Sequence, residues 1–321
     1  MLGELIAISA VLTFVGSNVI FRKTENEASP TFINFFRTAI GTLTFIIIVL
    51  FLNRLNLIFL IPWELWLLLI FSFVFGQVIG DTAYFVAQKE LGTTISLAIS
   101  MTFPLFTFIL SLIFFNQAFR LNLVLSLFLI GIGVVIIGKS KNTSEIRNQQ
   151  RNYNLETSFH EFWKKKYVKS ISFCFIASIG WAIGAVMIEF ATRQIDQIIY
   201  VKELSSVIGN LIRFPFALLI LSSMVLRENH LSKKKDIVSY QKKSMHTWIY
   251  LLVASIIGTS IGAYLYTESV HLAGANTVSL IASASPLFAL PLTYLVNKER
   301  ISWYGFIGVI LTILGVIIIL I

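Results

Sequence analysis

The chain has 321 residues, of which 56% are hydrophobic and 13% are charged, and its formal net charge is +9. A soluble domain of this composition would expose large apolar patches, so we exclude a soluble protein. The apolar residues come in long blocks and not in short alternating segments, which excludes a transmembrane β-barrel. The single cysteine, Cys174, excludes an internal disulfide and a cysteine-based metal cluster.

Long apolar blocks follow one another along the chain. With about 20 residues for each crossing, they predict about ten transmembrane helices, at residues 2–21, 30–52, 63–87, 92–116, 121–138, 169–191, 204–226, 247–270, 274–296 and 302–321. Most connections are short, so successive helices are expected to run antiparallel. Two polar segments, 139–168 and 227–246, interrupt this pattern and concentrate the Lys and Arg residues. The predicted fold class is an all-α integral membrane protein.

The two halves of the chain resemble each other. Residues 76–106 align without gaps on residues 258–288, and this register pairs Gly76 with Gly258, Gly80 with Gly262, Tyr84 with Tyr266, Pro104 with Pro286 and Gly133 with Gly315. Each repeat holds about five helices, an odd number, so the second copy must enter the membrane from the opposite side. The repeat predicts three parts: a first unit at 1–138, a polar connecting loop at 139–168, and a second, inverted unit at 169–321. Secondary transporters are built this way, with the substrate path between the repeats.

Residues 102–138 and 284–319 each combine a proline-containing helix, a polar turn and a glycine-rich closing helix. In these segments, and over nearly the whole chain, the sequence resembles the ten-helix EamA-type transporters of the drug/metabolite transporter superfamily. Glu299 stands where that family has a glutamate in the turn, whereas the first unit has Gln117 and departs from the pattern. The resemblance implies transport of a small metabolite, often export of an amino acid or a related compound. It does not fix the substrate.

Two charged residues of the first half, Asp81 and Arg37, lie well inside predicted spans. Asp81 falls in the later half of the third helix and Arg37 in the earlier half of the second, so both belong to the same half of the membrane. At a rise of 1.5 Å per residue, each lies on the order of 5–8 Å from the midplane, and the two can pair. One interpretation is a proton or substrate-ion site at Asp81 that Arg37 tunes. The other is a buried structural ion pair.

The repeat distinguishes Arg37 from Asp81, because only Arg37 has a charged counterpart in the second half. The earlier helices align more weakly, with Phe14 on Trp181 and Arg37 on Arg213, while Asp81 falls on Ala263. The arginine is therefore duplicated and the carboxylate is not. Arg213 needs another partner, for which the sequence offers Glu189, the substrate or a group of carbonyls. Glu189 lies near a helix end, where snorkelling to the interface is expected.

Further candidates for the substrate or ion pathway carry polar or aromatic groups inside the spans: Gln77, Asn34, Tyr84, Tyr266 and Trp181. Their structural alternative is hydrogen bonding between helices, or for Trp181 contact with lipid. Candidates for helix packing and bending are the small or helix-breaking residues of the repeat: Gly76, Gly80, Gly258, Gly262, Pro104 and Pro286. His271, beside a short turn, is expected to be solvated.

Residues 133–140, GVVIIGKS, match the letters of a phosphate-binding loop. Such a loop needs a strand before it and a helix starting at the Lys-Ser pair, whereas this run is the apolar end of a predicted helix. We therefore reject ATP binding there. No other enzyme or metal-site motif is present, so we expect no enzyme, no cofactor and no metal.

The expected partners are a small-molecule substrate, the lipid bilayer and a coupling ion, for which a proton is the candidate; nucleic acid is not expected. The expected location is the plasma membrane, with many crossings. The basic loops predict a cytoplasmic side opposite to both termini, while the family resemblance implies that both termini are cytoplasmic. The alternative function is a flippase for an amphipathic or lipid-linked substrate, which the many Phe residues and few intramembrane charges would suit.

Overall fold

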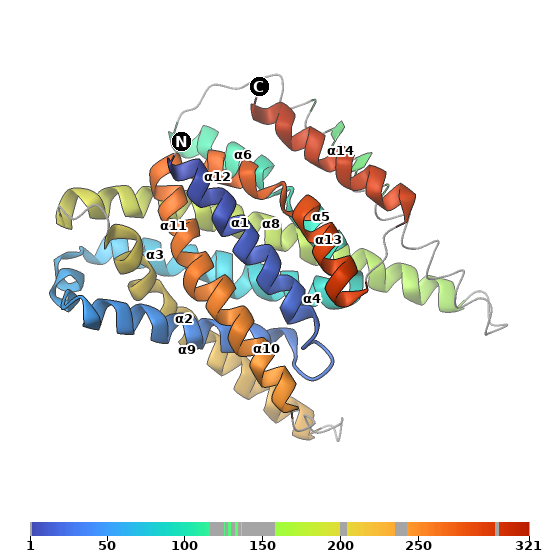
Figure 1. Ribbon diagram of the computed structural model, residues 1–321, viewed down its shortest axis with the longest axis horizontal. Coiled ribbons are helices and arrows are strands. Elements are labelled where there is room, and N and C mark those ends of the chain that lie inside the picture. Colours follow the sequence, from blue (N-terminus) through green and yellow to red (C-terminus); the bar gives the residue numbers. More distant parts are fainter. Residues whose placement is uncertain are drawn as a thin grey trace.

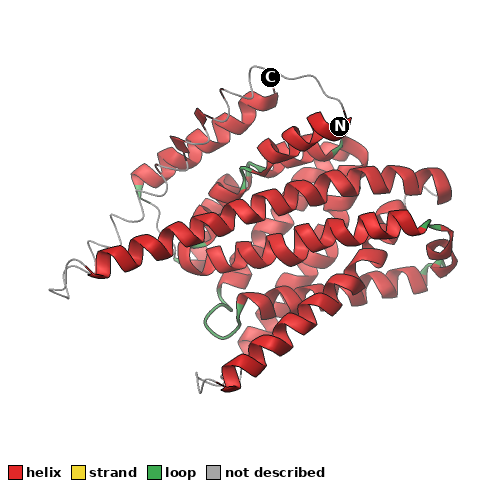
Figure 2. Cartoon of the chain, turned by 180° about the vertical axis from the view of Figure 1, so that it is seen from behind, coloured by secondary structure: helices red, strands yellow, loops and turns green. Residues whose placement is uncertain are grey.

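The computed structural model describes residues 2–115, 158–199, 204–234, 243–298 and 302–320, together with six positions between 125 and 136. Within these segments every regular element is a helix, and the helices form one bundle (Figure 1). The view from behind shows only short loops between the helices of the described parts (Figure 2). The predicted all-α fold class is confirmed. Helices suit a bilayer because each one satisfies its own backbone hydrogen bonds.

The elements follow the predicted spans closely, and several of them join into longer stretches. In chain order they are α1 (Leu2–Arg22), α2 (Pro30–Phe51), η1 (Leu55–Leu60), α3 (Trp63–Phe73), η2 (Val74–Asp81), α4 (Thr82–Leu91), α5 (Thr93–Ser100), α6 (Phe103–Phe115), α8 (Ser158–Ile199), α9 (Ser205–Lys234), α10 (Met245–Ser255), η4 (Ile256–Ile261), α11 (Gly262–Ala273), α12 (Ala275–Ala282), α13 (Ser285–Asn297) and α14 (Trp303–Leu320). The predicted span at 121–138 and the turn residues Gln117 and Glu299 lie almost entirely outside the described residues.

Seven helical stretches in the described chain are long and apolar enough to cross a membrane. Two shorter apolar helices, Phe288–Asn297 and Trp303–Gly315, follow them. A chain with this many apolar helices is a multi-pass membrane protein. The count of ten helices and the inverted relation of the two halves stay predictions.

Two helices run further than the sequence predicted. α8 begins at Ser158, inside the segment 139–168 that was expected to be a loop, and α9 continues to Lys234, well into the second polar segment. Neither extension contains Pro or Gly. Hydropathy marks where a helix leaves the apolar layer, but a helix stops only at a breaker or a cap, so both helices continue beyond it.

The first helix of each half packs on the interrupted third helix of the other half. α1 lies along α10, η4 and α11, and α8 lies along α3, η2 and α4. Figure 1 shows α1, in dark blue, running beside the orange α10 and α11. The two halves are thus interlocked, and the surfaces between them are buried in the middle of the bundle.

A π-helical segment interrupts each third helix at aligned positions. η2 separates α3 from α4, and η4 separates α10 from α11. Short π segments insert an extra residue into a helix and are frequent at functional sites. The sequence predicts one continuous helix over 63–87 and another over 247–270, because residue spacing and hydropathy do not reveal an extra residue in a helical turn.

The two prolines of the repeat stand at helix starts and not inside helices. The helical conformation is interrupted at Met101–Thr102, just before Pro104, and at Ser283–Ala284, just before Pro286. At the first turn of a helix the missing N–H of proline has no intrahelical partner to lose. The carbonyl of Ser100 at the first break accepts a hydrogen bond from Oγ of Ser178 at 2.7 Å. The breaks, more than bends within a helix, are therefore the feature that these prolines mark.

The aligned glycine stripes contact different helices. Gly76 and Gly80 face Gly180 and Gly184 of α8, where a Cβ on Gly180 would lie 2.4 Å from the carbonyl oxygen of Phe75. Gly258 and Gly262 face Ser17 and Thr13 of α1, with a Cβ on Gly258 only 2.1 Å from Oγ of Ser17. Backbone approach of this kind is what small residues allow between membrane helices.

Candidate functional site

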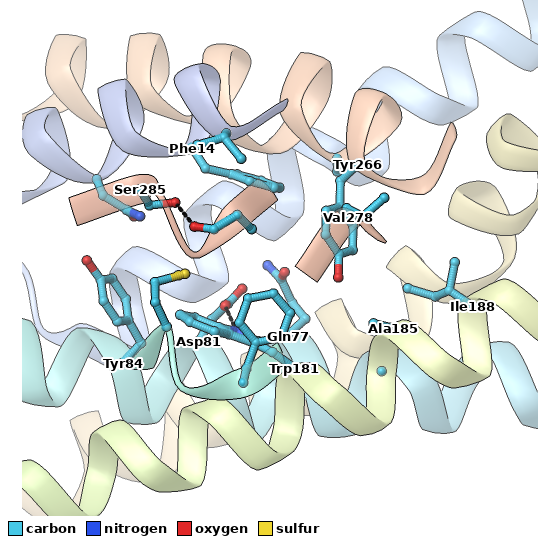
Figure 3. Close-up of a pocket in the computed structure, with 18 of the residues that line it drawn as sticks. Phe14, Gln77, Asp81, Tyr84, Trp181, Ala185, Ile188, Tyr266, Val278 and Ser285 are labelled. Carbon is cyan, nitrogen blue, oxygen red and sulfur yellow. Dashed lines mark hydrogen bonds between the residues drawn. The ribbon is translucent and has the colours of Figure 1, made fainter. Parts of the chain in front are cut away.

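A cavity of about 140 Å³ lies between the two halves (Figure 3). Helices from both halves line it, and most of its walls are apolar. A cavity of this order holds a molecule the size of benzene, which is more than a single water molecule needs. Seven of the eight predicted pathway residues line it, with Asn34 the exception: Asp81, Arg37, Arg213, Gln77, Tyr84, Tyr266 and Trp181.

Asp81 ends η2 and is buried beside the cavity. Its Oδ2 lies 3.2 Å from Nη2 of Arg37, and its Oδ1 accepts a hydrogen bond from Nε1 of Trp181 at 2.7 Å. Figure 3 shows Asp81 and Trp181 at the same wall of the cavity. The ion pair expected from the sequence is therefore present. Since it both neutralises two buried charges and borders the cavity, it fits the functional and the structural interpretation alike.

Arg37 connects the two halves of the molecule. Its Nε donates to Oγ1 of Thr259 in η4 at 2.9 Å, and its Nη2 also lies 3.4 Å from Oε1 of Gln77 in η2. Gln77 and Thr259 occupy aligned positions of the repeat. Arg37 thus contacts the same position in both π segments.

Asn34 holds α2 against η2 from behind the cavity wall. Its Nδ2 donates to the carbonyl oxygen of Gln77 at 2.7 Å and to Oγ1 of Thr82 at 2.9 Å. In return, Nε2 of Gln77 donates to Oδ1 of Asn34 at 3.2 Å and to Oγ1 of Thr38 at 2.9 Å. This reciprocal network satisfies buried polar groups and sets the orientation of Gln77, so Asn34 acts as a support for residues that line the cavity.

Arg213 of α9 lines the cavity from the second half and is 2% exposed. Its guanidinium donates to Asn210 in the preceding turn and to Thr267 of α11, and it lies over the ring of Phe73, 4.6 Å from the ring centroid. Glu189, one partner considered from the sequence, is not among these contacts. Arg213 therefore reaches the cavity with neutral partners, in contrast to Arg37.

Aromatic rings form much of the remaining wall. Tyr84 packs on Trp181 with 5.5 Å between ring centroids, and Tyr266 meets Phe14 edge to face at 5.8 Å. Figure 3 shows Tyr84 and Tyr266 well apart among the residues that line the cavity. Trp181 was left from the sequence as either a cavity wall or a contact with lipid. The structure places it in the wall.

Two predictions about polar residues near helix ends are wrong. Glu189 does not reach the interface by snorkelling: it is buried, pairs with Arg193 at 2.7 Å and accepts a hydrogen bond from the backbone N–H of Ala275 at 2.8 Å. His271 is not solvated, and its Nε2 lies 2.9 Å from Oδ2 of Asp196. Tertiary packing brings both contacts about: the unpaired N–H groups at the start of α12 attract the carboxylate of Glu189, and packing of α11 against α8 brings His271 to Asp196.

The sequence did not single out Thr259, which contacts Arg37, or Thr267 and Phe73, which contact Arg213. Threonine and phenylalanine are common in membrane helices, so only their contacts single them out. One signal was available: Asn34-x-x-Arg37 recurs as Asn210-x-x-Arg213 in the weakly aligned helices. That pattern points to Asn210 as a neighbour of Arg213.

The cavity offers no set of metal ligands. Its lining contains one carboxylate, Asp81, and neither His nor Cys. Across the part of the chain that the structure describes, no three His, Cys, Asp or Glu side chains gather closely enough to hold a metal ion. What the described cavity provides is charge, hydrogen-bond donors and apolar surface, which suits binding more than covalent chemistry.

Comparison with known proteins identifies the family of the chain. The pattern of the EamA-like transporter family matches residues 1–139 and 168–321. An "Uncharacterized transporter" of Archaeoglobus fulgidus is 24% identical over 322 residues, covering 100% of this chain and 98% of that protein. The "Uncharacterized transporter YetK" of Bacillus subtilis is 21% identical over 315 residues, covering 98% of this chain and 86% of that protein.

One solved crystal structure superposes over most of the molecule. It covers 99% of this chain and 96% of its own, with a TM-score of 0.62 and 15% sequence identity. At that identity the likeness shows a shared fold. The family match and the relatives' names together point to a membrane transporter and away from an enzyme.

Proposed function

Because the chain belongs to the EamA-like transporter family, we propose that it is a secondary transporter that exports a small metabolite, such as an amino acid or a related compound. The proposed mechanism is alternating access between two inverted repeats, residues 1–138 and 169–321, around a site at their interface. The segment 139–168 would connect them. We place this transporter in the plasma membrane.

The observation that carries the proposal is the cavity between interlocked halves. Charged groups inside a membrane protein are costly and face pathways or internal partners. Here Asp81, Arg37 and Arg213 all border one cavity, to which both halves contribute. In the proposed cycle the substrate occupies this cavity, and rocking of the halves exposes it to each side in turn.

We assign Asp81 and Arg37 to the route itself, with Asp81 as the acceptor of a coupling proton. A carboxylate beside both an arginine and a cavity is suited to this role, because protonation would weaken its attraction to Arg37 and so couple charge to conformation. Tyr84, Tyr266, Gln77 and Trp181 are assigned to the wall that contacts substrate, and Asn34 to the support of Gln77.

The test is transport in proteoliposomes that contain the purified protein, with a metabolite panel and imposed pH gradients. We expect at least one small metabolite to move without ATP, and faster with a pH gradient than without one. Asp81→Asn should remove the pH dependence. If Asp81→Asn leaves both transport and its pH dependence intact, proton coupling through Asp81 is excluded. If the wild-type protein moves no member of the panel, the transporter assignment for small metabolites is wrong.

The alternative is a flippase for an amphipathic substrate, and the mostly apolar lining of the cavity favours considering it. The same proteoliposomes, prepared with a fluorescent lipid in one leaflet, distinguish the two. Movement of lipid between leaflets without metabolite transport would support the flippase. A cavity of about 140 Å³ is small for a lipid, so we expect the metabolite result.

A further inference from the structure

Arg213 has hydrogen-bond donors that the protein does not use. A guanidinium carries five N–H donors. Nε and Nη2 of Arg213 donate to Oδ1 of Asn210 at 2.9 and 2.5 Å, and Nη2 also donates to Oγ1 of Thr267 at 2.7 Å. Nη1 is buried and has no hydrogen-bond acceptor among the described residues. Both of its N–H donors are therefore unpaired, on a residue that lines the cavity.

The charge of Arg213 is also uncompensated within the described part of the chain. Asn210, Thr267 and the ring of Phe73 are neutral, and no carboxylate there forms an ion pair with Arg213. Arg37, by contrast, is balanced by Asp81. The cavity therefore carries one excess positive charge, and a buried unpaired charge of this kind favours an anion that can reach it.

The repeat shows where that anion would sit. In the first half Asp81 supplies a carboxylate to Arg37, while the aligned residue in the second half is Ala263, which lines the cavity. A methyl group stands where the protein could have supplied its own carboxylate. The carbonyl oxygen of Ala263 accepts hydrogen bonds from Asn210 and Thr267, the two residues that bind Arg213, so the missing carboxylate belongs to the surroundings of Arg213.

We infer that the cavity binds a small monocarboxylate, with the carboxylate on the guanidinium of Arg213 and a compact apolar body against the aromatic and aliphatic walls. This inference rests on the proposed function and names the substrate class of that site. A phosphate ester is a poorer match, because its phosphate group carries a charge of about −1.5 to −2 and three acceptor oxygens. A single unpaired guanidinium with apolar surroundings satisfies only part of that demand.

The test is calorimetric titration of the purified protein in lipid nanodiscs with three ligands of one shape: 3-methylbutanoate, 3-methylbutanamide and 3-methylbutylamine. We expect the acid to bind about 10- to 100-fold more tightly than the amide, in keeping with a hydrogen bond to a charged group. This comparison uses the wild-type protein and needs no variant. Arg213→Gln should remove the preference for the acid over the amide.

Arg227→Gln is the matched control, because Arg227 is an exposed residue of the same helix and does not line the cavity. It should keep the wild-type preference for the acid. Equal binding of acid and amide by the wild-type protein would overturn the inference, as would an undiminished preference in Arg213→Gln. If proteoliposomes move a neutral or cationic metabolite and no carboxylate, the inference fails while the transporter assignment stands. If nothing is transported but the acid still binds through Arg213, the transporter assignment fails alone.

Discussion

α2 and α9 carry the same Asn-x-x-Arg pattern, but the two halves use it differently. In the first half Asn34 is bound to Gln77 and Thr82, so Arg37 turns to Asp81. In the second half Asn210 itself binds the arginine, through Nε and Nη2 of Arg213. Two aligned arginines thus line one cavity, one inside an ion pair and one outside any ion pair that the described residues form.

The difference follows from one substitution in the repeat, Asp81 against Ala263. A buried arginine with a carboxylate is neutral as a pair and can serve the scaffold or a proton. The charge of a buried arginine with neutral partners is not balanced by the protein and can pair with an anionic ligand. The same backbone pattern therefore gives one half a paired group and the other half an anchor, which is how near-symmetric halves can build an asymmetric binding site.

The largest expected effect comes from the same substitution at both arginines. Arg37→Gln leaves the Asp81 carboxylate buried without its partner and should lower the free energy of unfolding by about 3–5 kcal/mol. Arg213→Gln leaves no carboxylate of the described structure without its partner, so it should lower the free energy of unfolding clearly less. The measurement is unfolding by sodium dodecyl sulfate titration in mixed micelles.

The double variant Arg37→Gln/Asp81→Asn supplies the control. It removes both charges, so it should recover most of the free energy that Arg37→Gln loses. Equal losses for the two single arginine variants would show that the ion pair does not distinguish the halves.

The aligned glycines should differ as well. A methyl group on Gly76 would meet no atom closer than 3.9 Å, whereas on Gly258 it would lie 2.1 Å from Oγ and 2.5 Å from Cβ of Ser17. Gly258→Ala must push α1 away and should lower the free energy of unfolding by about 1–3 kcal/mol. Gly76→Ala, measured by the same titration, should change it little. A similar loss at both positions would contradict the closer packing of α1.

A carboxylate placed in the second half should make the halves alike. In Ala263→Asp the new side chain stands at the position aligned with Asp81, in the lining of the cavity to which Arg213 also belongs. It should pair with Arg213, compete with an external carboxylate and weaken binding of 3-methylbutanoate about tenfold. Ala263→Asn, which has the same shape without the charge, is the control for crowding and should weaken binding less. Tighter binding in Ala263→Asp than in Ala263→Asn would contradict the assignment.

The smallest effect concerns a contact between the halves at one end of the bundle. The carboxylate of Glu27 accepts hydrogen bonds from the backbone N–H and the hydroxyl of Ser244, at 2.7 and 3.1 Å. Hydrogen bonding by the Ser244 N–H, and then by the Thr247 hydroxyl, holds the pKa of Glu27 below its ordinary value of 4.5. A lowered pKa means that the contact stabilises the fold above about pH 4.5 and stops doing so as pH falls and Glu27 is protonated.

Glu27→Gln should therefore be slightly less stable than the wild-type protein at pH 7, and the difference should vanish as the pH is lowered below 4.5. Thermal unfolding in detergent between pH 3.5 and 7 measures it. Glu64→Gln, at an exposed position of α3, controls for loss of one negative charge. A difference that grows on acidification would contradict the lowered pKa.

Much of the architecture could be predicted because membrane insertion leaves a strong periodic signal. Long apolar blocks predicted the helices, and aligned glycines and prolines predicted the repeat. Exact helix ends, the π segments and the breaks before Pro104 and Pro286 could not be predicted, since hydropathy averages over about 20 residues. The solvated state predicted for His271 was wrong because Asp196 is distant in sequence and near only in the fold.

The sequence by itself determined that this protein lies in a lipid bilayer and which family it resembles. It also identified the residues whose charge inside an apolar helix required a partner. It also showed that Asp81 lacks a counterpart while Arg37 has one. Only the tertiary structure decided which partner each charge received, because contacts between helices depend on their packing and not on local spacing. Asp81 meets Arg37 and Trp181, and Arg213 is left with neutral neighbours at the cavity.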